Sequence, residues 1–152
     1  MSGFLSKCGL KGTYVLFVRR DGKIISFKRG NNLVVDKGLN LAGERAFIGS
    51  GPIIEYFAIG SGNATPLPTD TELETEVVDT KTVATTVTVT LNQCSLVFSH
   101  TVLAPFTMRE IGIFNAAGFE TGDMFSRFLT QEVDLAVGDV VDLTWVLQIT
   151  GA

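Results

Sequence analysis

Cysteine and histidine are scarce in this chain. Its 152 residues include two cysteines, Cys8 and Cys94, and one histidine, His100. Two cysteines cannot build the disulfide framework of a small secreted domain, and these two lack the spacing of a zinc site. We therefore expect free thiols, synthesis in a reducing cytoplasm, no metal ion and no cofactor.

Long apolar runs are also missing. The apolar stretches are far too short to cross a bilayer, and the N-terminus has no signal-peptide core, so we expect no membrane partner. Even so, 45% of the residues are hydrophobic and the mean hydropathy is +0.32. This apolar content has two readings, either a thick β core or a surface that is buried against other subunits.

The motifs of common enzymes are absent. There is no Gly-x-Ser-x-Gly nucleophile turn, no three-glycine dinucleotide fingerprint, and no Lys-Ser or Lys-Thr pair directly after the glycines of residues 59–63. His100 alternates in register with Leu96 and Phe98, which predicts a packed or rim histidine rather than a general base. We expect no catalytic residues and no enzymatic activity.

Charge is distributed unevenly along the chain. The net charge is -4, yet residues 1–30 hold seven basic side chains and one acidic one. Such polarity suits head-to-tail contacts or docking on an acidic neighbour, with a solvated strand face as the alternative. The acidic remainder opposes binding to phosphate groups, so we expect no nucleic-acid partner.

The first third of the chain predicts a hairpin and a helix. Arg20-Asp21-Gly22 lies between two β-rich runs, a strong hairpin signal. Residues 1–12 are interpreted as an arm and residues 13–30 as a basic hairpin, with Asn31-Asn32 as a further turn. Residues 36–47 have helical spacing, and Asp36 is suited to cap their first turn.

The remaining chain alternates like β-strands. Residues 81–91 have period two, with Val83, Thr85, Val87, Val89 and Leu91 on one face and threonine or alanine on the other. Further strand patterns cover residues 94–102, 108–115, 125–135 and 141–150. Thr69-Asp70-Thr71-Glu72 has the form of a capping box for a single helical turn. The pattern predicts one all-β domain over residues 1–152, an antiparallel β-sandwich with one short helix. A jelly roll is an equally open topology.

Two groups of residues are candidate contact sites with other subunits. Gly60 and Gly62 allow a turn or a close backbone approach. Alternating acidic residues follow them, and we interpret these as a solvated acidic edge or a docking site for a basic arm, in preference to a cation site. The candidate interface residues are Arg19, Arg20, Lys28 and Arg29 of the hairpin, and Gly60, Gly62, Asp70, Glu72, Glu74 and Glu76.

Three blocks, in order, carry a family resemblance. Asp36-Lys37-Gly38-Leu39-Asn40-Leu41-Ala42 is the first. Residues 59–76, with Gly-Ser-Gly, Thr-Pro and Thr-Asp-Thr-Glu-Leu, are the second, and Arg109-Glu110-Ile111-Gly112-Ile113-Phe114 is the third. Together the blocks resemble the attachment domain of the phage tail-collar fibre family over roughly residues 31–150. The resemblance implies a virion structural protein and supplies no catalytic residues.

The sequence ends at Ala152, soon after the last predicted strand, so we expect the attachment module without a fibre behind it. We expect a capsid decoration or cement protein that stabilises the assembled head of a tailed-phage virion. The alternatives are a tail, neck or baseplate adaptor, or a carbohydrate-binding module that uses Tyr14, Tyr56 or Trp145. The expected partners are the major capsid protein or tail and neck proteins, with a homodimer or homotrimer made in the host cytoplasm.

Overall fold

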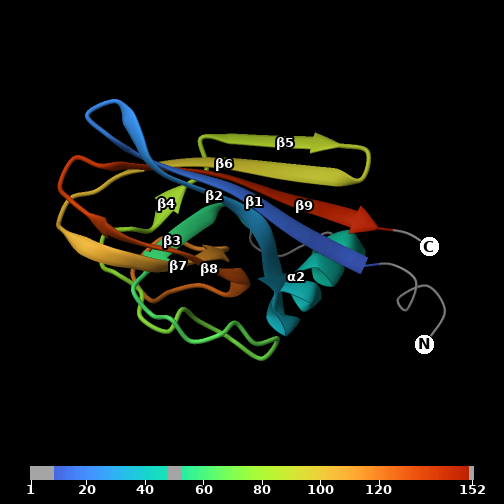
Figure 1. Ribbon diagram of the computed structural model, residues 1–152. Helices are drawn as coiled ribbons and strands as arrows, with labels where there is room; N and C mark the ends of the chain where they lie inside the picture. Colours follow the sequence, from blue (N-terminus) through green and yellow to red (C-terminus); the bar gives the residue numbers. More distant parts are fainter. Residues whose placement is uncertain (1–8, 48–52, 151–152) are drawn as a thin grey trace.

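The computed structural model describes residues 9–47 and 53–150, and this part of the chain is mostly β with one helix, as the sequence predicts (Figure 1). Every strand pair is antiparallel. The elements are β1 (Gly9–Arg20), β2 (Lys23–Val34), α2 (Asp36–Phe47), β3 (Tyr56–Gly60), β4 (Thr82–Val83), β5 (Thr86–Thr90), β6 (Gln93–Thr101), β7 (Phe106–Phe114), β8 (Met124–Leu135) and β9 (Val140–Thr150).

All nine strands belong to one curled sheet with the order β4-β3-β7-β8-β2-β1-β9-β6-β5. The curl is made at β2, which pairs with β1 as far as Asn32 and then pairs with β8 through Leu33 and Val34. Figure 1 shows the result, with β5, β6, β9 and β1 in one layer and β3, β7 and β8 in the other. The sheet therefore folds over and faces itself.

The core lies between these two layers. Phe57 of β3 stacks on Phe98 of β6 with ring centroids 4.9 Å apart, and Phe125 of β8 meets Trp145 of β9 edge-on at 5.6 Å. These four side chains are almost completely buried. The predicted inward faces of β6 and β9 are confirmed at their central positions, because burial alternates along both strands.

The β1–β2 hairpin forms at the predicted turn but is longer than predicted. Asp21 and Gly22 have φ values of 51° and 76°, as a tight two-residue hairpin turn requires. Residues 9–12 do not belong to an arm, because they pair with β9, and residues 1–8 lie outside the described part. The turn predicted at Asn31-Asn32 is also wrong, since both residues continue the ladder with β1.

The predicted strand over residues 81–91 is split in two. β4 pairs with β3 in one layer, whereas β5 pairs with β6 in the other. Between them, Ala84 N donates to Glu55 O at 2.7 Å and Thr85 N donates to Val97 O at 2.7 Å. The chain changes layer at Ala84 and Thr85, which period-two alternation alone does not reveal.

Helix α2 has the predicted bounds and covers one end of β8. Gly38 is required there, because a Cβ at this position would lie 2.1 Å from the backbone oxygen of Phe125. The helical turn predicted at residues 69–72 does not form; the chain bends there without helix. In the described part of the chain, no helix has the length and apolarity needed to span a bilayer.

Phe98→Ala should lower the free energy of unfolding by about 3–5 kcal/mol, since it empties a fully buried position between the layers. Phe119→Ala is the control, because Phe119 is 43% exposed and its truncation should cost less than about 0.5 kcal/mol. Urea denaturation measures both. Equal losses in the two variants would contradict the two-layer core.

Candidate functional site

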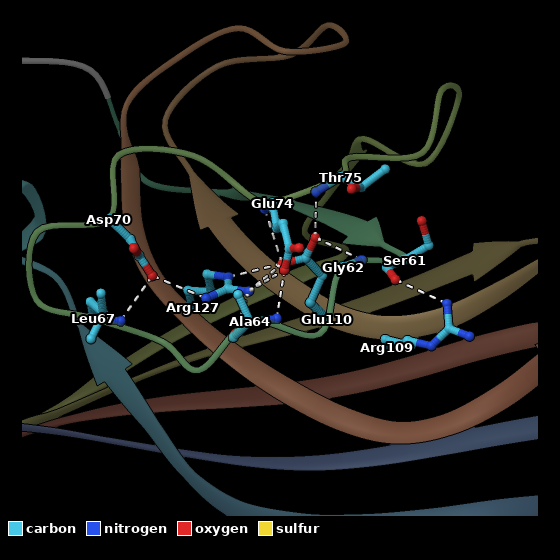
Figure 2. A network of polar contacts seen from close by, with 10 residues as sticks. All are labelled: Ser61, Gly62, Ala64, Leu67, Asp70, Glu74, Thr75, Arg109, Glu110 and Arg127. Carbon is cyan, nitrogen blue, oxygen red and sulfur yellow. Dashed lines mark hydrogen bonds and ion pairs between the residues drawn. The ribbon is translucent and has the colours of Figure 1, made fainter.

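A buried ion pair lies beneath the segment that joins β3 to β4. Glu110 of β7 is fully buried and Arg127 of β8 is 2% exposed. Arg127 approaches Glu110 Oε2 with both Nε and Nη2, each at 2.8 Å (Figure 2). The short double contact compensates for the removal of two charges from water.

The Glu110 carboxylate also holds both ends of the segment over residues 61–76. Its Oε1 accepts hydrogen bonds from the backbone N–H groups of Gly62 at 3.2 Å and Thr75 at 2.8 Å. Its Oε2 accepts one from Glu74 N at 3.2 Å. One side chain of β7 therefore satisfies three buried or half-buried backbone donors of a segment with no regular structure.

The Arg127 guanidinium holds the middle of the same segment. Nη1 donates to Asp70 Oδ2 at 3.0 Å, and Nη2 donates to the Ala64 carbonyl oxygen at 2.8 Å. Asp70 Oδ2 also accepts a hydrogen bond from Leu67 N at 2.9 Å. Figure 2 shows these contacts converging from several parts of the segment onto Glu110 and Arg127.

Gly60 and Gly62 allow this approach within the chain itself. A Cβ on Gly60 would lie 2.4 Å from Glu110 Oε1, and one on Gly62 would lie 2.4 Å from Glu74 Cβ. Both glycines are buried. Because glycine has no Cβ, the backbone of the segment can approach the sheet closely at both positions.

The four predicted acidic residues have different environments. Asp70 and Glu74 belong to the network around Arg127, whereas Glu72 is exposed. Glu76 pairs with Lys81 at 3.4 Å, and both side chains are 5% exposed. These residues do not share the face of a strand, and in the described residues no group of three acidic, thiol or imidazole side chains is placed to hold a metal ion.

Lys81 fastens a second loop. Its ammonium lies 3.8 Å from the centre of the Phe114 ring and donates to the Thr121 carbonyl oxygen at 3.0 Å. Burial lowers the pKa of Lys81, and the Glu76 carboxylate opposes that shift. Glu76 also accepts a hydrogen bond from Glu120 N at 2.8 Å, so the loop after β7 is joined to the same segment.

The basic residues of the hairpin differ in whether they already have a partner within the chain. Arg19 pairs with Asp142 at 2.6 Å, and Arg20 forms two hydrogen bonds to Asp139, at 2.9 and 2.7 Å. The Asp139 side chain is 2% exposed, and hydrogen bonding to Arg20 lowers its pKa. Lys28 reaches the Leu129 carbonyl oxygen at 3.4 Å, while Arg29 is exposed.

Sequence reasoning missed Arg127 and Lys81, although one signal for Arg127 was present. Arg127 is a single charged residue within the apolar start of β8, between Phe125 and Phe128. A charge at such a position needs a buried partner, and Glu110, which follows Arg109 in β7, is the one charged residue on the buried positions of that strand. The partner and the segment that it holds follow only from the fold.

His100 is packed as predicted, at 8% exposure. Its Nδ1 lies 3.0 Å from Thr82 Oγ1, and its ring meets Phe57 at 6.3 Å between centroids. Burial lowers the pKa of His100. The hydroxyl contact joins β4 to β6 and therefore helps to hold the two layers together.

No protein-family model matches the chain, and neither does any of the curated proteins or solved structures with which it was compared. The site is therefore interpreted from its own geometry. The charged groups of Glu110 and Arg127 bind each other and the backbone of the segment over residues 61–76. Together they hold this segment against β7 and β8.

Glu110→Ala should cost about 3–5 kcal/mol of unfolding free energy, because it leaves the Arg127 charge buried without its main partner. The double variant Glu110→Ala with Arg127→Met should lose less unfolding free energy than the sum of the losses in the two single variants. Glu132→Ala is the control: its side chain is 66% exposed, so the loss should stay below about 1 kcal/mol. Urea denaturation of the four variants tests this, and additive losses would refute the coupling.

The buried imidazole should make stability depend on pH. Because the folded-state pKa of His100 lies below its ordinary value of 6.5, the unfolded chain takes up this proton first. Stability should therefore fall as the pH drops below about 6.5 and be unaffected by this group above it. His100→Gln should remove that component. Denaturation curves between about pH 7.5 and pH 5.5 measure it, and identical pH slopes in both proteins would count against it.

Proposed function

We propose that this protein is a non-enzymatic structural component of a tailed-phage virion, best fitted to a capsid decoration protein that binds and stabilises the assembled head. The observation that carries the proposal is the contact between two of the blocks that resemble the tail-collar attachment domain. Glu110, from the block 109–114, binds the backbone of the block 59–76 at Gly62, Glu74 and Thr75. Residues of this motif are therefore explained by the folding of one domain and require no catalytic role.

The outer face of the β1–β2 hairpin supports a docking role. Phe17 and Phe27 are directly opposite each other, with ring centroids 5.0 Å apart, and Phe27 remains 49% exposed. Arg29 shares this face with Phe27, because residues two apart in a strand point the same way. Exposed aromatic and arginine side chains are the residue types that dominate binding energy in protein interfaces. We assign this face, named the hairpin face, to contact with the capsid.

The proposed mechanism is mass action. A protein that binds the assembled shell and not its dissociated subunits stabilises the shell by its binding free energy. A rigid domain suits this role, since little conformational entropy is lost on docking. The ion pair of Glu110 and Arg127, with its four backbone contacts, supplies that rigidity in the longest irregular segment.

The curled sheet also fits the proposed sandwich class of such modules. We propose that the sheet is a sandwich whose two layers remain joined through β2. Side chains of both layers meet in one core, which supports this proposal. A sugar-binding role is less favoured, since Tyr14 and Trp145 are only 3% and 2% exposed and cannot stack on a sugar ring.

The copy number in purified virions tests the location. Decoration of the head predicts on the order of hundreds of copies per particle, because shells repeat their docking points by symmetry. A count of about a dozen or fewer would instead support the neck or baseplate adaptor. Quantitative mass spectrometry of particles of the encoding phage measures it. Absence of the protein from particles would overturn the virion proposal.

The double variant Phe27→Ala with Arg29→Glu should weaken binding to particles lacking the protein by about tenfold or more. These residues are used in preference to Arg20, whose reversal would disturb the buried Asp139. The control is Phe119→Ala with Lys37→Glu, which makes matched changes at exposed positions outside the hairpin face. Cosedimentation with particles measures binding, and equal binding by both variants would exclude the hairpin face.

A further inference from the structure

Strand β5 forms one edge of the sheet and is open to solvent. It ends the strand order, and among the described residues β6 is its one strand partner. All five residues of β5 are exposed; Val87 is 51% exposed and Val89 is 73% exposed, and Leu91, which follows, is fully exposed. An edge strand presents unpaired backbone donors and acceptors to another strand.

This edge carries none of the usual protection against pairing. Proteins block exposed edges with charged side chains, proline, bulges or a very short strand. Residues 82–99 contain no charged side chain and no proline, and β5 pairs with β6 in unbroken register. Alternating valine and threonine are also among the residues that best fit a pleated surface.

The sequence of β5 is the same in both directions. Thr86-Val87-Thr88-Val89-Thr90 is a palindrome. A twofold axis through Thr88 would place Val87 opposite Val89 of a second copy, and Thr86 opposite Thr90 of that copy. Each face of the new ladder would then contain like side chains, valine with valine and threonine with threonine, which are favourable cross-strand pairs.

The valine face of β5 continues the face that is buried elsewhere in this layer. Val87 is opposite Leu96 and Val89 is opposite Cys94, and Leu96 is only 2% exposed. β5 therefore extends an apolar face beyond the part of the sheet that the other layer covers. A second β5 beside it would remove part of this apolar surface from water.

We propose that two copies of this chain join edge to edge through β5, antiparallel and twofold symmetric about Thr88, to form one continuous sheet across the dimer. The occupant of the edge is a second copy because the palindrome and the lack of charge make the strand self-complementary. Two copies are expected to join in this way whether or not the hairpin face contacts a capsid.

Val89→Lys should weaken dimerisation about tenfold or more, since it places a charge opposite Val87 on both sides of the axis. Val137→Lys is the matched control: Val137 is 66% exposed in the turn before β9, so dimerisation should not change. Sedimentation velocity over about a hundredfold range of concentration measures the equilibrium. A wild-type monomer throughout, or equal dimerisation of both variants, would overturn the proposal.

A cysteine at the axis tests the register separately. Thr88→Cys should form an 88-to-88 disulfide between copies under mild oxidation, because directly opposite Cα atoms lie about 4.5–5.5 Å apart. Thr86→Cys should not form the corresponding 86-to-86 bond, whose Cα atoms would be about 14 Å apart. Mass spectrometry of linked peptides separates these bonds from those of Cys8 and Cys94. Absence of the 88-to-88 bond, or equal linking at both positions, would refute the register.

Discussion

The buried contact between Glu110 and Arg127 is the interaction on which the irregular segment over residues 61–76 depends. The two side chains come from neighbouring strands, and together they bind the backbone at Gly62, Ala64, Glu74 and Thr75. A segment with this little regular structure satisfies only some of its own backbone groups, such as Ser61 N with Thr75 O. The sheet does so in its place, through one carboxylate and one guanidinium that are both removed from solvent.

A second constraint is the closure of the sheet on itself. β2 joins the layers on one side, and the chain crosses between them again at Ala84 and Thr85 on the other. The crossing allows Phe57 and Phe98 to stack and places His100 against Thr82. It also leaves β5 beyond the covered region, so the same closure that completes the core creates the open edge.

The candidate interface residues thus divide into those that make contacts within the chain and those that remain exposed. Gly60, Gly62 and Asp70 act within the chain, and so do Arg19 and Arg20. Among the described residues, the two surfaces that we propose for partners are the hairpin face and the β5 edge, which lie on different strands and offer different chemistry. One is aromatic and basic, suited to an acidic neighbour; the other is uncharged and self-complementary, suited to a second copy.

The sequence by itself determined the all-β class, the hairpin turn at Asp21-Gly22, helix α2 and the inward faces of β6 and β9, because these depend on local dihedral preferences and period-two burial. It did not determine the end of the arm, the break between β4 and β5, or the roles of Gly60 and Arg127. Only the tertiary structure decided those, because each depends on partners far away in the chain: β9 for residues 9–12, and Glu110 for Arg127. Local patterns indicate that a buried charge needs a partner, whereas the fold decides which partner it has.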